Sequence, residues 1–217
     1  MSVTVLLPTY NEEENISGMI SSIHSVSQEW KILVVDGGST DRTVELARKA
    51  GADIFIFPER GKGKAISAAF AREDADTLVL LDADMSYPPS EIPKLLARLS
   101  ECDVVVGSRF SGSIEEGAMK GINKFGNRCL TFLGNLLYGG RITDLCSGLW
   151  AFRKEAYKKM RITAPHFELE ANFFTECMRK KMKLCEVPIE YKKRGGTAKI
   201  SVADGFRIFS FLLSNRF

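Results

Sequence analysis

The 217-residue sequence has little of what secreted, zinc-dependent or membrane-spanning proteins need. Its five cysteines are odd in number and show no C-x-x-C spacing. This argues against a disulfide framework or a zinc knuckle and favours a reducing compartment. Only two histidines occur, far apart, so zinc hydrolase chemistry has no support. No apolar run approaches the roughly 20 residues that cross a bilayer, and the apolar amino terminus lacks the basic leader of a secretion signal.

The sequence also has little excess of charge of either sign. The net charge of +3 is too small to indicate a nucleic-acid partner, and two short basic clusters, residues 179–181 and 192–194, are typical of solvated faces. With 45% hydrophobic and 26% charged residues, the composition is that of an ordinary soluble globular protein. No repeat or low-complexity linker divides the chain, so we expect one domain over residues 1–217.

Strand and helix patterns alternate through the first half of the chain, which predicts an α/β fold with a mostly parallel, twisted sheet and helices on both faces. The expected strands are 3–8, 31–36, 53–57, 77–82 and 103–107, and the expected helices are 12–27, 40–50, 64–72 and 89–100. The second half predicts helices 121–138 and 171–181, a turn and strand over 144–153, a strand over 185–191 and a mobile basic loop over 192–201.

The stretch 77–84 organises the rest. Its apolar residues do not alternate with polar ones, as in a strand buried on both faces, and it ends at Asp82 and Asp84. Residues two apart in an extended chain point to the same side, so both carboxylates can reach one target. Paired carboxylates suit a divalent cation that also carries phosphate oxygens. A strand end followed by a helix beginning near Pro88 explains the same residues without a metal.

Other strand ends are equally polar, and ligands bind beyond the carboxyl ends of such strands. This predicts an open crevice in which Asp36 contacts a ribose or base and Tyr10 stacks on or borders it. The run 60–64 joins glycines and basic residues at a helix start, which suits an anion, although a surface turn has the same composition. It lacks the spacing of a Walker loop.

The carboxyl-terminal stretch 206–213 is very apolar, with Arg207 and Arg216 around it. We expect an amphipathic helix over residues 202–217 that lies at a membrane interface. A helix docked on the protein's own core explains the pattern equally well.

Together these stretches resemble the family 2 glycosyltransferases of the GT-A fold, most closely the polyprenol-phosphate (dolichol-phosphate) mannose and glucose synthases. The matching stretches follow one another along nearly the whole chain: residues 8–12, 36–41, 61–63, 82–88, 107–109, 144–153 and 186–201. Two positions depart from the family pattern: Ser86 stands where the family has Gln, and Ala198 stands where it has Ser before the lysine.

The resemblance implies a role for each matching residue. The nucleotide pocket would comprise Pro8, Tyr10, Glu12, Asp36, Lys62, Asp82 and Ala83. Asp82, Asp84 and Ser86 would hold Mg²⁺ or Mn²⁺. Asp84, Arg109, Arg128 and Lys199 would act in catalysis, the arginines on phosphate groups and Lys199, with Ser201, from a loop that closes over the donor.

The implied activity is inverting transfer of a hexose from a GDP- or UDP-sugar to a polyprenyl phosphate, on the cytoplasmic face of a membrane. Negative charge grows on the departing nucleoside diphosphate, and a divalent cation with Arg or Lys stabilises it. An anionic lipid phosphate needs no general base. A sugar hydroxyl as acceptor would need one, and Glu168 or Glu170 is the candidate.

Two other classes remain open. A sugar-nucleotide pyrophosphorylase shares the strand–helix plan and paired acids, but it would carry a glycine-rich basic loop after the first strand, unlike residues 9–12. A non-catalytic nucleotide-sugar binder would keep the pocket without transfer. The absence of a Q-x-x-R-W segment argues against a processive polysaccharide synthase.

Overall fold

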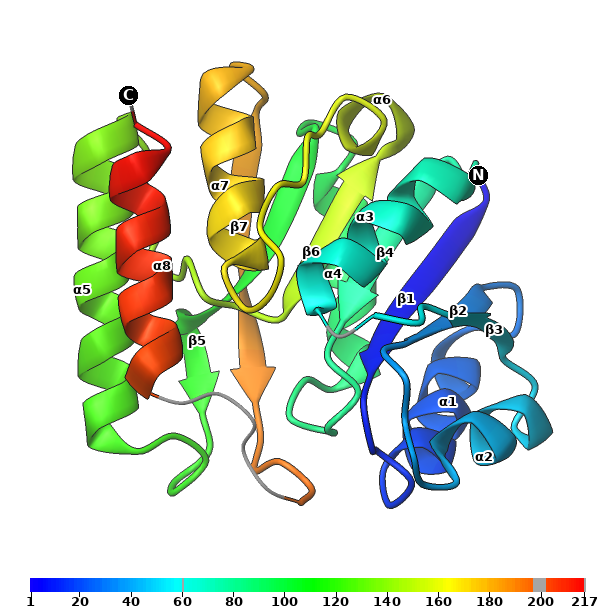
Figure 1. Ribbon diagram of the computed structural model, residues 1–217. Helices are drawn as coiled ribbons and strands as arrows, with labels where there is room; N and C mark the ends of the chain where they lie inside the picture. The colour runs from blue at the N-terminus through cyan, green and yellow to red at the C-terminus, as the bar shows by residue number, and fades with distance from the viewer. Residues whose placement is uncertain (60, 197–201, 217) are drawn as a thin grey trace.

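A seven-stranded sheet forms the centre of the protein in the computed structural model, which describes residues 1–59, 61–196 and 202–216. The strand order is β3-β2-β1-β4-β6-β5-β7 (Figure 1). The strands are β1 Val3–Thr9, β2 Lys31–Asp36, β3 Asp53–Ile56, β4 Thr77–Leu81, β5 Val104–Ile114, β6 Leu149–Arg153 and β7 Leu184–Tyr191. Among the strands of the described residues, only β6 runs antiparallel to its neighbours, β4 and β5, and the mostly parallel sheet predicted from the sequence is confirmed.

Helices pack against both faces of the sheet. The α-helices are α1 Ile16–Val26, α2 Thr43–Lys49, α3 Lys62–Arg72, α4 Ile92–Arg98, α5 Gly121–Tyr138, α6 Lys154–Tyr157, α7 Leu169–Arg179 and α8 Val202–Ser214, and a 3₁₀ turn covers Pro89–Glu91. One hydrophobic core lies under α1, α2 and α4, and the other lies under α3, α7 and α8. In β4, Val79 and Leu81 enter the first core whereas Leu78 and Leu80 enter the second. Both faces are thus buried, which is why the sequence shows no alternation.

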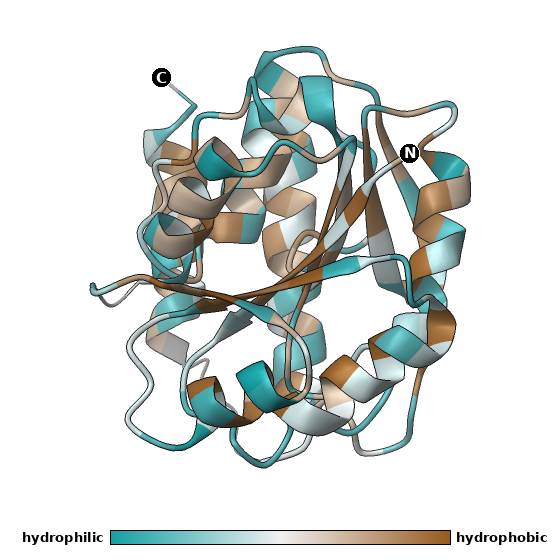
Figure 2. Cartoon of the chain, turned by 90° about the vertical axis from the view of Figure 1, so that its right-hand side faces the viewer, coloured by the Kyte–Doolittle hydropathy of each residue, from teal (hydrophilic) through white to brown (hydrophobic). Residues whose placement is uncertain are grey.

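An aromatic cluster fixes β6 beneath α3 and α7. The ring centroids of Phe152 and Phe173 are 4.9 Å apart, and Phe70 lies 5.3 Å from Phe152 and 5.7 Å from Phe173. Trp150 lies 5.6 Å from Phe173. Such pairs add about 0.5–1.5 kcal/mol each beyond their burial. The cluster explains why the irregular second half of the chain returns through the middle of the sheet. Figure 2 shows the apolar strands in brown between more polar helices and loops.

The largest difference from the predicted elements concerns β5, which continues to Ile114 instead of ending at 107. Its polar extension pairs with β7 after an irregularity between Ser108 and Ser113. Close pairing there needs Gly112, because a Cβ at this position would meet the backbone of Ile189. Smaller shifts occur at helix starts: α1 begins at Ile16 and α3 already at Lys62.

The expectation of no disulfide is wrong, since Cys102 and Cys185 are joined by one. Cys102 lies two residues before the start of β5, and Cys185 faces Val105 across the parallel β5–β7 pair. Adjacent parallel strands bring the cysteines together although 83 positions separate them in the chain. Cysteine spacing contains no sign of such a contact, and the argument for a reducing compartment is lost with it.

Helices α5 and α8 lie side by side at one edge of the molecule, green and red in Figure 1. Ile208 and Leu212 of α8 are buried, and the hydroxyl of Tyr138 donates to the carbonyl of Leu212 at 2.8 Å. The helix therefore docks on the protein's own core. It also keeps Phe206, Phe209 and Leu213 exposed. Among the residues that the structure describes, no helix is long and apolar enough to cross a membrane.

Candidate functional site

The candidate site lies where β1, β2 and β4 end and where the chain enters β6. The backbone N–H of Asp82 donates to the carbonyl of Gly148 at 3.1 Å, and the N–H of Gly148 donates to the Tyr87 hydroxyl at 2.7 Å. A Cβ at Gly148 would meet the Asp82 carboxylate and the Tyr87 ring. The antiparallel strand β6 thus sets the position of the Asp82 side chain.

Asp82 and Glu170 share the ammonium group of Lys62. Lys62 Nζ lies 2.7 Å from Asp82 Oδ1 and 2.8 Å from Glu170 Oε1. Burial lowers the pKa of Lys62, but the two carboxylates outweigh it and hold this pKa above its ordinary value. For the acidic Glu170, burial raises the pKa, and this outweighs the lowering effect of the nearby Lys62 ammonium. The site therefore keeps a permanent cation beside Asp82.

The glycines of the run 61–63 bring Lys62 to this place. Gly61 has a φ of 143°, which side chains rarely adopt, and a Cβ there would come within 2.5 Å of the Pro165 carbonyl oxygen. A Cβ at Gly63 would meet the carbonyl of Ala164. The loop before α7 thus packs on the start of α3, so Lys62 from one and Glu170 from the other face each other.

Asp84 is buried and paired differently. One carboxylate oxygen, Oδ1, accepts from the Ser86 N–H at 3.0 Å and from the Ser86 hydroxyl. The other, Oδ2, pairs with Arg194, whose loop follows β7. The carbonyl of Asp84 accepts the N–H of Gly195 at 2.8 Å. Ser86, expected beside the metal, is itself buried and holds the Asp84 side chain in place.

The predicted nucleotide residues line the ends of β1 and β2. Pro8, Tyr10 and Glu12 are half-buried. Asp36 is buried, and its carboxylate accepts the N–H groups of Gly38 and Ser39 at 3.0 and 2.8 Å. It therefore shapes the loop after β2, and its contact with a ribose or base stays a prediction. Ala83 is buried between the two aspartates.

Arg109 forms a buried, bidentate ion pair with Asp144. Its Nε and one terminal nitrogen each lie 2.7 Å from an Asp144 oxygen, and the Cys146 carbonyl accepts a further bond at 2.9 Å. The guanidinium also lies 5.3 Å from the Tyr191 ring centroid. Burial lowers the pKa of Arg109, but Tyr87 and Asp144 more than offset this and the pKa stays raised. Its action on phosphate stays a prediction, since its side chain here binds Asp144 and the Cys146 carbonyl.

The remaining predicted cations are spread out. Arg128 is exposed on α5, with its guanidinium 5.3 Å from the Phe110 ring centroid. Lys199 and Ser201 lie outside the described residues. Sequence reasoning did not single out Arg194, Gly148 or Tyr87. Arg194 belongs to a basic cluster that was interpreted as a solvated face, and only the fold reveals its contact with Asp84.

The residues present fit a divalent cation that is held jointly by protein and ligand. Asp82 and Asp84 supply the hard carboxylate oxygens that a divalent cation prefers. Each of them already binds a cationic side chain, so both carboxylates lie where a positive charge can reach them. Within residues 1–59, 61–196 and 202–216, no group of three His, Cys, Asp or Glu side chains converges. The further ligands of a cation would then come from diphosphate oxygens and water.

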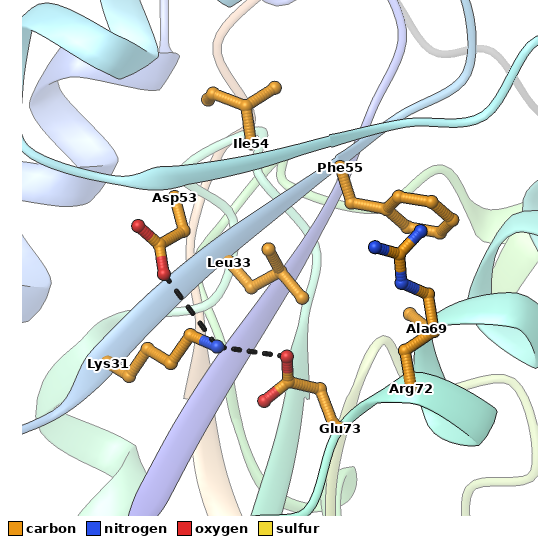
Figure 3. A pocket seen from close by; sticks show the side chains of 8 residues that line it. All are labelled: Lys31, Leu33, Asp53, Ile54, Phe55, Ala69, Arg72 and Glu73. Atoms are coloured by element: carbon orange, nitrogen blue, oxygen red, sulfur yellow. Dashed lines mark hydrogen bonds and ion pairs between the residues drawn. The ribbon is translucent and has the colours of Figure 1, made fainter.

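A hollow of about 260 Å³ lies elsewhere, at the amino ends of β2 and β3 (Figure 3). Lys31 spans it and lies 3.0 Å from Glu73 and 3.7 Å from Asp53. The Arg72 guanidinium lies 4.7 Å from the Phe55 ring centroid. Since positive and negative side chains are balanced here, the hollow offers no charge for a diphosphate, and the rim around Asp82 remains the candidate site.

Two curated relatives from Haloferax volcanii are similar to this chain in sequence. The Haloferax volcanii low-salt glycan biosynthesis hexosyltransferase Agl6 is 34% identical over 99% of this chain and 54% of its own length. A dolichyl-phosphate hexose transferase of the same organism is 32% identical over 91% of this chain and 86% of its own. The chain thus spans about half the length of the first of these relatives.

The fold is similar to that of solved glycosyltransferase structures. Glucosyl-3-phosphoglycerate synthase from Mycobacterium tuberculosis, solved with Mn²⁺, uridine diphosphate and phosphoglyceric acid, superposes with a TM-score of 0.80. The match covers 99% of this chain and 78% of that one at 22% identity, which confirms the GT-A fold. Residues 4–161 match the sequence model of Glycosyl transferase family 2. The resemblance inferred from the motifs is therefore confirmed, and the chain belongs to glycosyl transferase family 2.

Proposed function

We propose that this protein transfers a hexose from a GDP- or UDP-linked sugar to a polyprenyl phosphate, with inversion at the sugar carbon. The observation that carries the proposal is the pairing of Asp82 and Asp84 with protein cations at the carboxyl rim of the sheet. Relatives whose names include dolichyl-phosphate hexose transferase support this acceptor class. Family membership argues against a pyrophosphorylase.

The site's charges suit the departure of a nucleoside diphosphate. Mg²⁺ or Mn²⁺ held by Asp82 and Asp84 would supply charge neutralisation at the diphosphate. Lys62 stays protonated between Asp82 and Glu170, so it adds a fixed positive charge at the same rim. Fixed charges aimed at developing negative charge cost no reorganisation during the reaction. Tyr10, Glu12 and Asp36, at the ends of β1 and β2, would hold the nucleoside.

The two glutamates favour an acceptor that is already anionic. Glu170 is tied to Lys62 at 2.8 Å, and Glu168 accepts the N–H of His166 at 3.2 Å. A base for a sugar hydroxyl would have to leave these contacts. A lipid phosphate needs no proton removed and is attracted by basic side chains. The alternative acceptor, a glycan hydroxyl, is favoured only by the raised pKa of Glu170, which suits proton transfer.

A membrane surface is part of this proposal. Ile122, Phe125, Phe132 and Leu136 are exposed on α5, and Phe206, Phe209 and Leu213 are exposed on the adjacent α8. Exposed basic residues, Arg128 and Arg207, accompany them. Exposed apolar residues accompanied by basic side chains are typical of helices that lie in the headgroup region of anionic lipids. A peripheral position at a membrane would follow, and the cytoplasmic face is the side that we propose.

Transfer assays test the proposal directly. The purified protein is incubated with GDP- and UDP-hexoses, Mn²⁺ or Mg²⁺, and either a short polyprenyl phosphate or a set of saccharides. We expect metal-dependent transfer to the lipid phosphate only. Asp84→Asn should reduce it by at least about a hundredfold, whereas Asp53→Asn at the opposite rim should leave it unchanged. Turnover with metal removed, or transfer to saccharides alone, would refute the assignment.

Vesicle flotation tests the membrane part separately. Ile122→Ser combined with Phe132→Ser should reduce binding to vesicles containing anionic phospholipid by about tenfold or more, because two exposed apolar side chains that would enter the lipid are lost. The matched control is Ile56→Ser: Ile56 is 52% exposed on β3, against 68% for Ile122. Equal binding by both variants and the wild type would show that α5 does not contact lipid.

A further inference from the structure

Arg194 occupies the oxygen of Asp84 that a divalent cation would need. Ser86 holds Oδ1 through its N–H and its hydroxyl, both from within the same turn. Oδ2 faces Arg194, which comes from a loop 110 positions further along the chain. The Ser86 bonds belong to the local backbone geometry, whereas the Arg194 contact depends on a long side chain. Arg194 is therefore the partner that can leave.

The backbone beneath Arg194 is fixed, so the side chain can move without the loop. The N–H of Lys192 donates to the Ser86 carbonyl at 2.9 Å, and the N–H of Gly195 donates to the Asp84 carbonyl at 2.8 Å. Asn15 donates to the Gly195 carbonyl at 3.3 Å. The side chain of Arg194 is 29% exposed, and its buried Nε has no partner within the described part of the chain. Its attachment to the site thus rests mainly on the Asp84 carboxylate.

From these contacts we infer that Arg194 is an internal counter-ion of the site, which competes with the divalent cation for Asp84. Because Ser86 holds Oδ1 of Asp84, a guanidinium and a dication would have to share Oδ2, and at that distance they repel each other strongly in a partly buried site. Cation binding must therefore release Arg194, and Arg194 lowers the affinity of the empty site for metal. The inference rests on the proposed function for the assignment of Asp82 and Asp84 as cation ligands.

Such an arrangement has a consequence for the order of binding. Without ligand, Lys62 pairs with Asp82 and Arg194 pairs with Asp84, so each carboxylate of the acidic pair already has a cationic partner. Free Mn²⁺ or Mg²⁺ then gains little on entering. A cation that arrives with a nucleoside diphosphate brings its own oxygen ligands, and the diphosphate can accept the released guanidinium. Arg194 thus favours metal bound with nucleotide over metal bound alone.

Manganese binding without nucleotide tests this inference by measuring free Mn²⁺ with electron paramagnetic resonance. We expect Arg194→Ala and Arg194→Gln to bind Mn²⁺ about tenfold more tightly than the wild type, equivalent to about 1.4 kcal/mol. The matched control is Lys193→Ala, because Lys193 precedes Arg194 and pairs with Glu115 at 3.8 Å instead. Its affinity should equal that of the wild type. A loss of structure would weaken metal binding, so a gain cannot come from damage.

Chemical rescue gives a second readout. In Arg194→Ala, millimolar methylguanidinium should take the vacant place and weaken Mn²⁺ binding again, with no such effect on the wild type. Unchanged or weaker Mn²⁺ binding by both Arg194 variants, with the wild type binding normally, overturns the inference alone. If neither the wild type nor the variants bind Mn²⁺, even with nucleoside diphosphate, the proposed cation site fails as well.

Discussion

Near the site, Arg109 and Asp144 form an ion pair in which both side chains are buried. Asp144 is fully buried and accepts the Arg109 guanidinium at two oxygens. We predict that Asp144→Asn lowers the free energy of unfolding by about 3–5 kcal/mol, because it leaves a buried, uncompensated guanidinium. Urea denaturation measures the change.

Asp74→Asn is the matched control for this prediction. Asp74 also forms an ion pair, with Lys154 at 2.9 Å, but its side chain is 78% exposed. Solvent screens such an exposed pair, so Asp74→Asn should change the free energy of unfolding far less than Asp144→Asn. If the two variants lost similar amounts of free energy of unfolding, the Arg109 pair would not be buried as described. Arg109 would then be free to bind phosphate directly, as the sequence predicted.

Gly148 is a second residue whose identity the site requires. We predict that Gly148→Ala weakens Mn²⁺-dependent nucleotide binding by about tenfold or more, because the added methyl group displaces the Asp82 carboxylate or the Tyr87 ring. Isothermal titration measures it. Gly126→Ala, in the middle of α5 with open space at its Cβ, should leave binding unchanged and stabilise the helix by up to about 1 kcal/mol. Unimpaired binding by Gly148→Ala would contradict the tight contact.

At the level of elements, the Cys102–Cys185 disulfide ties the segment before β5 to the start of β7. We predict that Cys185→Ser lowers the free energy of unfolding by about 2–4 kcal/mol, because the cross-link limits the unfolded chain over a long loop. Denaturation with and without dithiothreitol measures it. Cys129→Ser, which removes an exposed free thiol, should change little. A wild-type stability that does not respond to reductant would contradict the prediction.

Elements with strong local patterns were predictable, and contacts between distant elements were not. The run ending at Asp82 and the helix over 121–138 follow from burial and periodicity, and both appear as expected. The run 60–64 was predicted to open a helix and to suit an anion, with a surface turn as the alternative; helix α3 begins at Lys62, which contacts Asp82, and the anion stays a prediction. The antiparallel entry of β6 was not predictable, because its position depends on aromatic packing among Phe70, Phe152 and Phe173.

The same limit applies to charged partners. Asp144 lies 35 positions from Arg109, and Arg194 lies 110 positions from Asp84. No sequence pattern links such distant residues, because they meet only when β6, β5 and β7 are added to the sheet beside β4. The sequence therefore indicates which residues carry charge at the rim, whereas the fold decides which of them neutralise each other.

For the whole molecule, ligand binding and folding are linked, because a ligand that binds only the folded state stabilises it by mass action. The ends of β1, β2 and β4, the start of α3 and the loop after β7 all contribute to the rim. A nucleoside diphosphate bound there therefore contacts elements from both halves of the chain. Its binding should raise the unfolding temperature of the entire domain.

We predict that Mn²⁺ together with the correct nucleoside diphosphate, at about 100 times its dissociation constant, adds roughly 2.7 kcal/mol of stability. For a protein of this size, this raises the unfolding temperature by about 5–10 °C. A thermal-shift panel of GDP, UDP and their sugars, each with and without Mn²⁺, identifies the base, since only one should act fully and only with metal. Asp82→Asn should lose the shift because the cation loses a carboxylate ligand, whereas Asp53→Asn should keep it. A shift that is independent of both metal and Asp82 would place the nucleotide away from the rim, and the electrostatic account of transfer would fail with it.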